Sequence, residues 1–358
     1  MSGKVRRFFP GGNTSRGFYS YYDYIIEKDA HRIFIIKGGP GVGKSSMMKE
    51  IAQEMLERGY DVEYHHCSSD DQSVDGIVII DLNIAIIDGT SPHIIDPRNP
   101  GVVDEIINLG DYWDVEKILS HKVEIIKTNQ KVGKLFNRAY KYFASARSIY
   151  GDIEERYSEA MDFGRVNELT HKCIKEIFKK VSVSKTAGKA RHLFGSAYTP
   201  RGWIDFTEHI LTDTKKVYYI KGDHGTGKST FLKRIYNEAI ERGLYVEVFH
   251  APLIPEKIET VYIKSLNVGL TISDQFKDKN QQVYNLNNYL NTTEIEKYDI
   301  LLNEDRKIMN LLIDTGLDNI KKAKELHDVL EGYYIANMNF TEINKVKENI
   351  ISRCLQMI

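Results

Sequence analysis

The sequence lacks the apolar stretches that membrane insertion or export requires. No segment of the 358 residues approaches the roughly eighteen apolar residues of a membrane span, and the N-terminus has no apolar core like that of a signal peptide. Cysteine is scarce: Cys67, Cys173 and Cys354 form an odd set without metal-ligand spacing. These absences predict a cytoplasmic protein in a reducing compartment, with no membrane partner.

An excess of charge is also missing. The chain has 49 Lys and Arg against 50 Asp and Glu, and its pI is near 6.8. This balance argues against a protein whose whole surface binds nucleic acid. The length is that of two domains, each large enough for its own core.

The strongest pattern that is present occurs twice, at residue numbers that differ by 184. The first glycine loop reads Gly38, Gly39, Pro40, Gly41, Val42, Gly43, Lys44 and Ser45, followed by Ser46. The second glycine loop reads Gly222, Asp223, His224, Gly225, Thr226, Gly227, Lys228 and Ser229, followed by Thr230. Both match G-x-x-x-x-G-K-[ST] between a strand-forming run and a helix-forming stretch, which predicts two nucleotide sites.

The residue types in this pattern suit a polyphosphate. Glycines let successive backbone N–H groups converge on an anion at the start of a helix. We expect Lys44 and Lys228 to contact the outer phosphates, and Ser45 and Ser229 to bind Mg²⁺. No Asn-Lys-x-Asp element for reading guanine is present, so ATP is the predicted nucleotide.

The repeat extends beyond the loops and predicts two whole domains. Thr14, Arg16 and Gly17 recur as Thr199, Arg201 and Gly202, and similar matches continue to the end of each copy. We place one domain at residues 1–186, with a helical appendage at about 112–180. The other spans 187–358, with an appendage at about 294–358.

Short apolar runs alternate with helical stretches in each copy, which predicts an α/β fold with a mainly parallel sheet. The expected strands of the first copy are 32–37, 61–66, 77–80 and 84–87. Those of the second copy are 216–221, 245–250, 260–264 and 266–271. The fold class is therefore two tandem nucleotide-binding domains, each a short, mainly parallel sheet flanked by helices and carrying a helical appendage.

Carboxylates distinguish the two copies. Asp81 and Asp88 each follow an apolar run and are candidate Mg²⁺ ligands, although aspartates also occur there simply as turn residues. The equivalent positions of the second copy are Ser265 and Ile272, and Asp223 adds a negative charge to its loop. We expect hydrolysis mainly at the first loop, with Asp88 the favoured catalytic carboxylate. His93 could approach the substrate or be structural.

Arg16 and Arg201 precede their loops by about twenty residues in matching turns. Their segments could cover the base, with Phe18 or Trp203 contacting it. Alternatively, the arginine of one copy could reach the γ-phosphate bound by the other. A surface arginine beside a glycine turn is the plainer interpretation.

One helical stretch of the first copy is strongly basic. Between Lys117 and Ile149 there are eight Lys or Arg and one acid, Glu124. Five of them share one helical face, which we call the basic ridge: Lys127, Lys131, Lys134, Arg138 and Lys141. This face could bind an anionic partner, either nucleic acid or an acidic protein, could contact the other domain, or could be an ordinary solvated surface.

These loops resemble those of the P-loop NTPase superfamily. The tandem arrangement resembles a largely uncharacterised group of bacterial ATPase-like proteins, through the segment at 11–18, both loops and the Asp-Gly-Thr-Ser-Pro-His run at 88–93. The resemblance implies ATP binding and hydrolysis involving Lys44 and Lys228. Three functions stay open: a Mg²⁺-dependent ATPase that couples ATP state to domain or partner rearrangement, a small-molecule or nucleoside kinase, and a non-catalytic nucleotide-binding scaffold.

Overall fold

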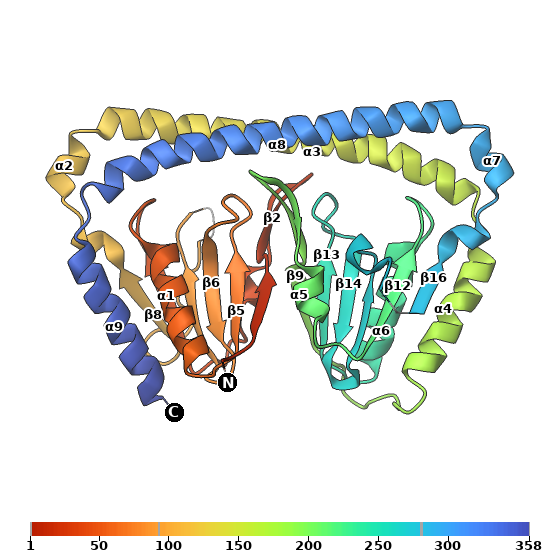
Figure 1. Cartoon of the computed structure of the whole chain (residues 1–358), viewed down its shortest axis with the longest axis horizontal. Helices are drawn as coiled ribbons and strands as arrows, with labels where there is room; N and C mark the ends of the chain where they lie inside the picture. The colour runs from red at the N-terminus through yellow and green to blue at the C-terminus, as the bar shows by residue number, and fades with distance from the viewer. Residues whose placement is uncertain (1, 92–93, 280–281, 358) are drawn as a thin grey trace.

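The computed structural model describes residues 2–91, 94–279 and 282–357 and contains two α/β units, each built on a six-stranded sheet (Figure 1). The strand orders are β1-β5-β6-β7-β4-β8 and β16-β12-β15-β14-β13-β9. These are the same topology, because each strand of the second order is the repeat partner of the strand in the mirrored place. Most neighbours run parallel, which confirms the predicted fold class of two mainly parallel sheets flanked by helices.

Corresponding strands occur in the two halves of the chain. The first sheet contains β1 (Val5–Phe8), β4 (Arg32–Lys37), β5 (Val62–His66), β6 (Val74–Ile79), β7 (Ile84–Asp88) and β8 (Asp104–Asn108). The second contains β9 (Ala190–Phe194), β12 (Lys216–Lys221), β13 (Val246–His250), β14 (Ile258–Ile263), β15 (Val268–Thr271) and β16 (Gln282–Asn285). Two hairpins stand apart from the sheets: β2 (Gly11–Thr14) with β3 (Gly17–Ser20), and β10 (Ser196–Thr199) with β11 (Gly202–Asp205).

The helices are α1 (Lys44–Glu57), α2 (Val115–Leu119), α3 (Lys122–Glu159), α4 (Phe163–Ile177), α5 (Thr207–Leu211), α6 (Lys228–Glu241), α7 (Thr292–Glu296), α8 (Asp299–Ile335) and α9 (Phe340–Gln356). Helices α1 and α6 follow the glycine loops and pack on their own sheets. Among the described residues, no helix is both long and apolar enough to cross a bilayer.

The expectation of four strands per copy was too low. The missed strands are the edges of the sheets, and they are short. Both β8, with sequence DEIIN, and β16, with sequence QVYN, are polar and partly exposed. An edge strand needs only one apolar contact face, so its residues lack the continuous apolar run of the central strands.

The long helices carry each half of the chain across to the other. Helix α3 begins beyond the outer side of the first sheet and ends beyond the second, while α8 packs along it in the reverse direction (Figure 1). We call α3 with α4 the first arm, and α8 with α9 the second arm. The second half therefore sends its arm to the first sheet, and the first half sends its arm to the second.

The ends of the arms belong to the opposite cores. Val166 and Cys173 of α4 are buried in the core of the second sheet, and Ile343 and Ile350 of α9 in that of the first. Burying an aliphatic side chain of this size contributes roughly 1.5–3 kcal/mol. Packing thus crosses the sequence boundary at 186/187, which stays a prediction for where the chain divides into domains.

A buried cluster of four charges joins the sheets at their facing edges. Arg6 binds Glu247 through two hydrogen bonds of 2.5 and 3.0 Å, and Arg191 binds Glu63 through two of 2.7 and 3.0 Å. Both pairs cross between the halves, and the side chains of Glu63 and Glu247 are about 5% and 4% exposed. Burial by itself would raise the pKa of Glu63, but the neighbouring charges and hydrogen bonds, foremost those of Arg191, lower it well below its usual value.

Candidate functional site

The two glycine loops have the same backbone conformation. Gly41 and Gly225 have φ of 70° and 74°, and Gly43 and Gly227 have φ of 89° and 90°. Such angles favour glycine, which explains why the pattern places it there. The first N–H groups of a helix have no acceptor within the helix. Each loop ends on a helix whose N-cap is a glycine, so no side chain caps these N–H groups either. Such an arrangement suits an anion.

The two lysines fold over their own loops. The Nζ of Lys44 donates to the carbonyls of Gly38 and Gly39 at 2.9 and 2.7 Å. In the second loop, the Nζ of Lys228 donates to the carbonyls of Gly222 and Asp223 at 2.5 and 2.6 Å. Each ammonium group is therefore held against carbonyl oxygens of its own loop.

The other residues of the two glycine loops contribute backbone groups or lie at the outer edge of the loop. The side chains of Val42 and Thr226 are buried, and that of Thr226 donates to the carbonyl of Asp223 at 2.8 Å. Ser46 and Thr230 are exposed on the first turn of their helices. Pro40 and His224 are partly exposed.

Two predicted residues of the first site lie close together. The carboxylate of Asp88 lies 3.6 Å from the Nζ of Lys44, because β7 pairs directly with β4 and ends at the same edge. Asp88 also accepts a hydrogen bond of 2.9 Å from the backbone N–H of Thr90. The Oγ of Ser45 accepts one of 3.0 Å from the N–H of Val74. Hydroxyl and carboxylate oxygens together form a donor set that suits Mg²⁺.

Asp81 does not join this group. Strand β6 runs antiparallel to both neighbours, so its end, followed by Asp81, lies at the opposite edge of the sheet from the first glycine loop. There Asp81 is exposed and accepts a hydrogen bond of 2.9 Å from the N–H of Asp61. Its predicted role as a metal ligand beside Ser45 does not fit this position. Pro92 and His93, the end of the run at 88–93, lie outside the described residues.

A buried acid at the other end of β6 was missed. Asp75 follows Val74, whose N–H binds Ser45, and its carboxylate accepts a hydrogen bond from the hydroxyl of Tyr22. Its repeat partner is Glu259, so an acid occupies this position in both copies. The repeat offered the signal, but the carboxylates predicted from the sequence were those that follow strands, whereas Asp75 lies at the beginning of one.

The second loop has no equivalent of Asp88. Ile272 occupies that position, and Asp274 instead accepts a hydrogen bond of 2.5 Å from the hydroxyl of Tyr219. Asp223 accepts one of 2.9 Å from the side-chain amide of Asn287. Among the described residues, no carboxylate forms an ion pair with Lys228. The asymmetry expected from the sequence is therefore present in the surroundings of the two lysines.

The surroundings change the titration of the second site. Burial lowers the pKa of Lys228 to about 8. Burial also raises the pKa of Glu259 to about 8, although a hydrogen bond of 2.9 Å from Ser196 opposes the shift. Around neutral pH the lysine is mainly protonated, and it loses its charge as the pH rises above 8.

This titration gives a testable pH dependence. Mg·ATP affinity at the second loop is expected to fall about tenfold between pH 7 and pH 9, because about one lysine in ten stays protonated one unit above its pKa. Calorimetry with the Lys44→Ala variant would measure the second loop alone.

The control is Lys228→Arg, since a guanidinium stays charged over this range and the profile should flatten. Glu259→Gln removes the other group that titrates near pH 8 and should leave the fall in place. An unchanged fall in Lys228→Arg would show that the lysine is not its cause.

The second arm covers the first glycine loop. A Cβ on Gly41 would lie 2.8 Å from the carbonyl oxygen of Glu331, and a Cβ on Gly39 would lie 3.0 Å from the ring of Tyr334. Tyr334 also packs against Trp113, with ring centroids 5.6 Å apart. The glycines of this loop are therefore required both by backbone conformation and by the close approach of α8.

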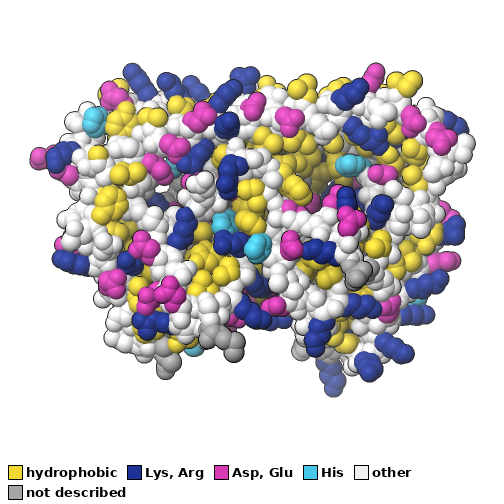
Figure 2. Space-filling model, in the orientation of Figure 1, with side chains coloured by type: hydrophobic (Ala, Val, Ile, Leu, Met, Phe, Trp, Pro, Cys, Tyr) yellow, Lys and Arg dark blue, Asp and Glu magenta, His cyan; other side chains and the backbone are white. Residues whose placement is uncertain are grey.

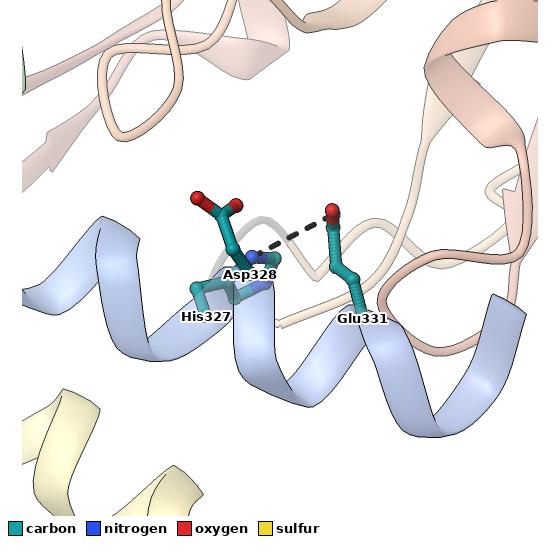
Figure 3. A group of neighbouring side chains, drawn as sticks. All are labelled: His327, Asp328 and Glu331. Atoms are coloured by element: carbon teal, nitrogen blue, oxygen red, sulfur yellow. Dashed lines mark ion pairs between the residues drawn. The ribbon is translucent and has the colours of Figure 1, made fainter.

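Polar side chains of α8 extend beside this contact. Figure 3 shows Asp328 and Glu331 pointing to the same side of the helix, and His327 Nδ1 lies 3.6 Å from the carboxylate of Glu331. The three offer ligand atoms within 4.8 Å of one another. Lys324 binds Asp328 and lies 3.4 Å from Asp70 of the first half. The ammonium group of Lys324 therefore already supplies a positive charge to this cluster of side chains.

The first arm covers the second glycine loop in the same way. The hydroxyl of Ser158 donates to the carbonyl of Gly225 at 3.1 Å. A Cβ on Gly225 would lie 2.9 Å from the Cβ of Tyr157. His224 packs against Tyr150, with ring centroids 4.8 Å apart. Each loop is therefore covered by the arm of the other half.

Arg16 and Arg201 also contact the opposite half. Arg16 forms an ion pair with Glu256, and Arg201 forms one with Asp71. Phe18 is packed beside Tyr22, with ring centroids 6.5 Å apart, whereas Trp203 is 54% exposed.

The basic ridge lies on the outside of the paired long helices. All five of its side chains are exposed, and none forms an ion pair with a carboxylate among the described residues. Dark blue side chains gather along the edge of the molecule where α3 and α8 run (Figure 2). Between Leu301 and Leu330, α8 has five basic and six acidic residues, so the excess of positive charge belongs to α3.

A charge reversal would test the predicted anionic partner. The variant Lys131→Glu, Lys134→Glu, Arg138→Glu is expected to lose salt-dependent binding to duplex DNA or single-stranded RNA in a shift assay, because lost phosphate contacts remove counterion release. The matched control reverses the exposed Lys307, Lys321 and Lys322 of α8. No binding by the native ridge, to these probes or to polyglutamate, would contradict an anionic partner.

The comparisons with known proteins give one match. Residues 20–79 match the family model described as Nephrocystin 3, N-terminal. This segment includes the first glycine loop, α1, β5 and β6, and nothing of the second half. Comparison with curated proteins and with solved structures gave no match.

Proposed function

We propose that the chain binds Mg·ATP at both glycine loops, hydrolyses it mainly at the first, and couples its nucleotide state to the position of the crossed arms. The observation that carries the proposal is the first loop itself. Its uncapped helix start, the Nζ of Lys44 and the carboxylate of Asp88 lie together, the last two 3.6 Å apart.

The residues of the first loop have separable tasks. The loop amides and Lys44 bind and orient the phosphates, and an ammonium group beside Asp88 stays available to a developing negative charge. Ser45 and Asp88 are the oxygen donors for Mg²⁺, which neutralises phosphate charge when bound. The loop of the second half lacks the carboxylate at position 272 and is therefore assigned mainly to binding.

The arms supply a route from nucleotide to rearrangement. Glu331, Tyr334 and Phe340 of the second arm lie against glycines of the first loop. A phosphate entering beside these glycines competes for the same space or adds contacts to the same side chains. Because each loop faces the arm of the other half, filling either loop acts on both halves of the chain.

A kinase is the second candidate, and the group on α8 favours it. His327, Asp328 and Glu331 place acid and base groups next to the first loop, on an arm that could serve as a lid over an acceptor (Figure 3). A phosphate acceptor needs a base of this kind within reach of its hydroxyl.

Calorimetry and turnover measurements with purified protein distinguish the functions. Binding of Mg·ATP over Mg·GTP with slow phosphate release, faster on addition of a partner, supports the ATPase. Turnover that requires an added nucleoside or small-molecule acceptor supports the kinase. Tight binding without turnover supports the scaffold, and absence of Mg·ATP binding by folded protein contradicts the proposal.

A further inference from the structure

Arg16 and Arg201 are presented by two equivalent tight turns. Between β2 and β3, the hydroxyl of Thr14 accepts from the N–H of Arg16 at 3.0 Å and donates to the carbonyl of Gly17 at 2.8 Å. Between β10 and β11, the hydroxyl of Thr199 makes the same two hydrogen bonds, at 3.2 and 2.9 Å. The turns fix the backbone and leave both guanidinium groups to extend outward.

Arg201 extends to the loop that precedes β6 of the first half. Its Nε and one Nη bind the same carboxylate oxygen of Asp71, the Nε at 2.6 Å. The Asp71 side chain is 3% exposed, whereas that of Arg201 is 60% exposed. Three residues beyond Asp71, the N–H of Val74 binds Ser45 of the first glycine loop at 3.0 Å.

Arg16 makes the reciprocal contact with the second half. Its Nε binds the carboxylate of Glu256, on the loop that precedes β14. Two residues later, the N–H of Ile258 binds Ser229 of the second glycine loop at 2.9 Å. Both copies thus place an arginine of one half on the loop that leads into a strand of the other half, and the first N–H of that strand bonds the serine of the glycine loop.

We propose that the arginines act across the halves: Arg201 contacts the phosphates bound at the first glycine loop, and Arg16 contacts those bound at the second. The inference rests on the proposed function and names the residues that complete each site. Neither glycine loop is then complete without the opposite half of the chain.

The geometry allows this contact without breaking the ion pair. A guanidinium has five N–H donors, and Asp71 engages the Nε–H and one Nη–H of Arg201. Three donors stay available, in a planar fork that suits phosphate oxygens. Asp71 is therefore a positioning residue, whose buried carboxylate orients an otherwise exposed arginine.

The test measures each loop separately. In a Lys228→Ala background, which isolates the first loop, Arg201→Ala is expected to lower turnover about 1,000-fold, the lower end for an arginine supplied to a phosphoryl transition state. Calorimetric affinity for Mg·ADP with aluminium fluoride should fall strongly, while affinity for Mg·ADP alone should change little. Arg16→Ala in the same background should lower turnover and aluminium fluoride affinity far less than Arg201→Ala does.

The reciprocal experiment uses Lys44→Ala, where loss of aluminium fluoride binding should follow Arg16→Ala instead. Arg58→Ala is the matched control, since Arg58 forms an exposed ion pair with Glu54 away from both loops. Arg201→Gln serves if the alanine variant is poorly folded.

The outcomes separate this inference from the proposed function. Normal Mg·ATP binding with aluminium fluoride affinity independent of both arginines, or dependent on the arginine of the same half, overturns the inference alone. Lower thermal stability with unchanged aluminium fluoride affinity would show that the arginines only stabilise the fold, and this result also overturns the inference. Absence of Mg·ATP binding by the native protein overturns both.

Discussion

Replacing Lys44 with alanine is expected to lower Mg²⁺-dependent ATP turnover about 100-fold or more, the usual loss when a fixed positive donor is removed from a transition state. Lys44 is the lysine that lies beside a strand-end carboxylate, 3.6 Å from Asp88. Lys228→Ala is expected to leave most of the turnover, because its surroundings lack that carboxylate. Phosphate release at saturating Mg·ATP measures both.

The control for these variants is Lys279→Ala, which removes an exposed lysine paired with Glu208. Asp88→Asn should resemble Lys44→Ala in turnover while retaining nucleotide binding, because it removes the carboxylate proposed to bind Mg²⁺ but none of the loop donors. Equal losses from Lys44→Ala and Lys228→Ala, or a greater loss from the second, would reverse the ranking of the two sites.

Replacing Glu63 with glutamine is expected to lower the free energy of unfolding by about 3–5 kcal/mol, the range for breaking a buried ion pair from one side. Glu63 accepts two hydrogen bonds from Arg191 and lies 3.3 Å from Arg6. Its loss would leave two guanidinium groups with Glu247 as their remaining carboxylate in the cluster. Urea unfolding at neutral pH measures the difference.

The matched control is Glu50→Gln, because Glu50 is 56% exposed and its ion pair with Lys347 is worth at most about 1 kcal/mol. The pH dependence gives a second readout. The lowered pKa of Glu63 means that its stabilisation is present above the ordinary glutamate pKa and lost as the pH falls through the folded-state value. A Glu63→Gln variant as stable as the native protein would show that the cluster does not join the halves.

Much of the site could be predicted, because the conformation of the glycine loop depends on residues that are close together in the sequence. The strand before it, the glycines with positive φ and the lysine and serine after it are all set by about a dozen consecutive residues. The position of Asp88 could also be predicted, since a carboxylate that follows a central apolar strand lies at the same edge of the sheet as the glycine loop whenever the two strands are parallel. Asp81 was misplaced, because the direction of β6 depends on its pairing with β5 and β7.

The sequence by itself determined that there are two copies, where each glycine loop lies, and which copy keeps a carboxylate at its strand end. Only the tertiary structure decided that the arms cross, that Asp81 lies at the edge of the sheet opposite the first glycine loop, and that Arg16 and Arg201 contact opposite halves. The physical reason is the range of the interactions. Backbone angles and helix starts depend on neighbouring residues, whereas strand direction and the partner of an amphipathic helix depend on burial against residues more than a hundred positions away.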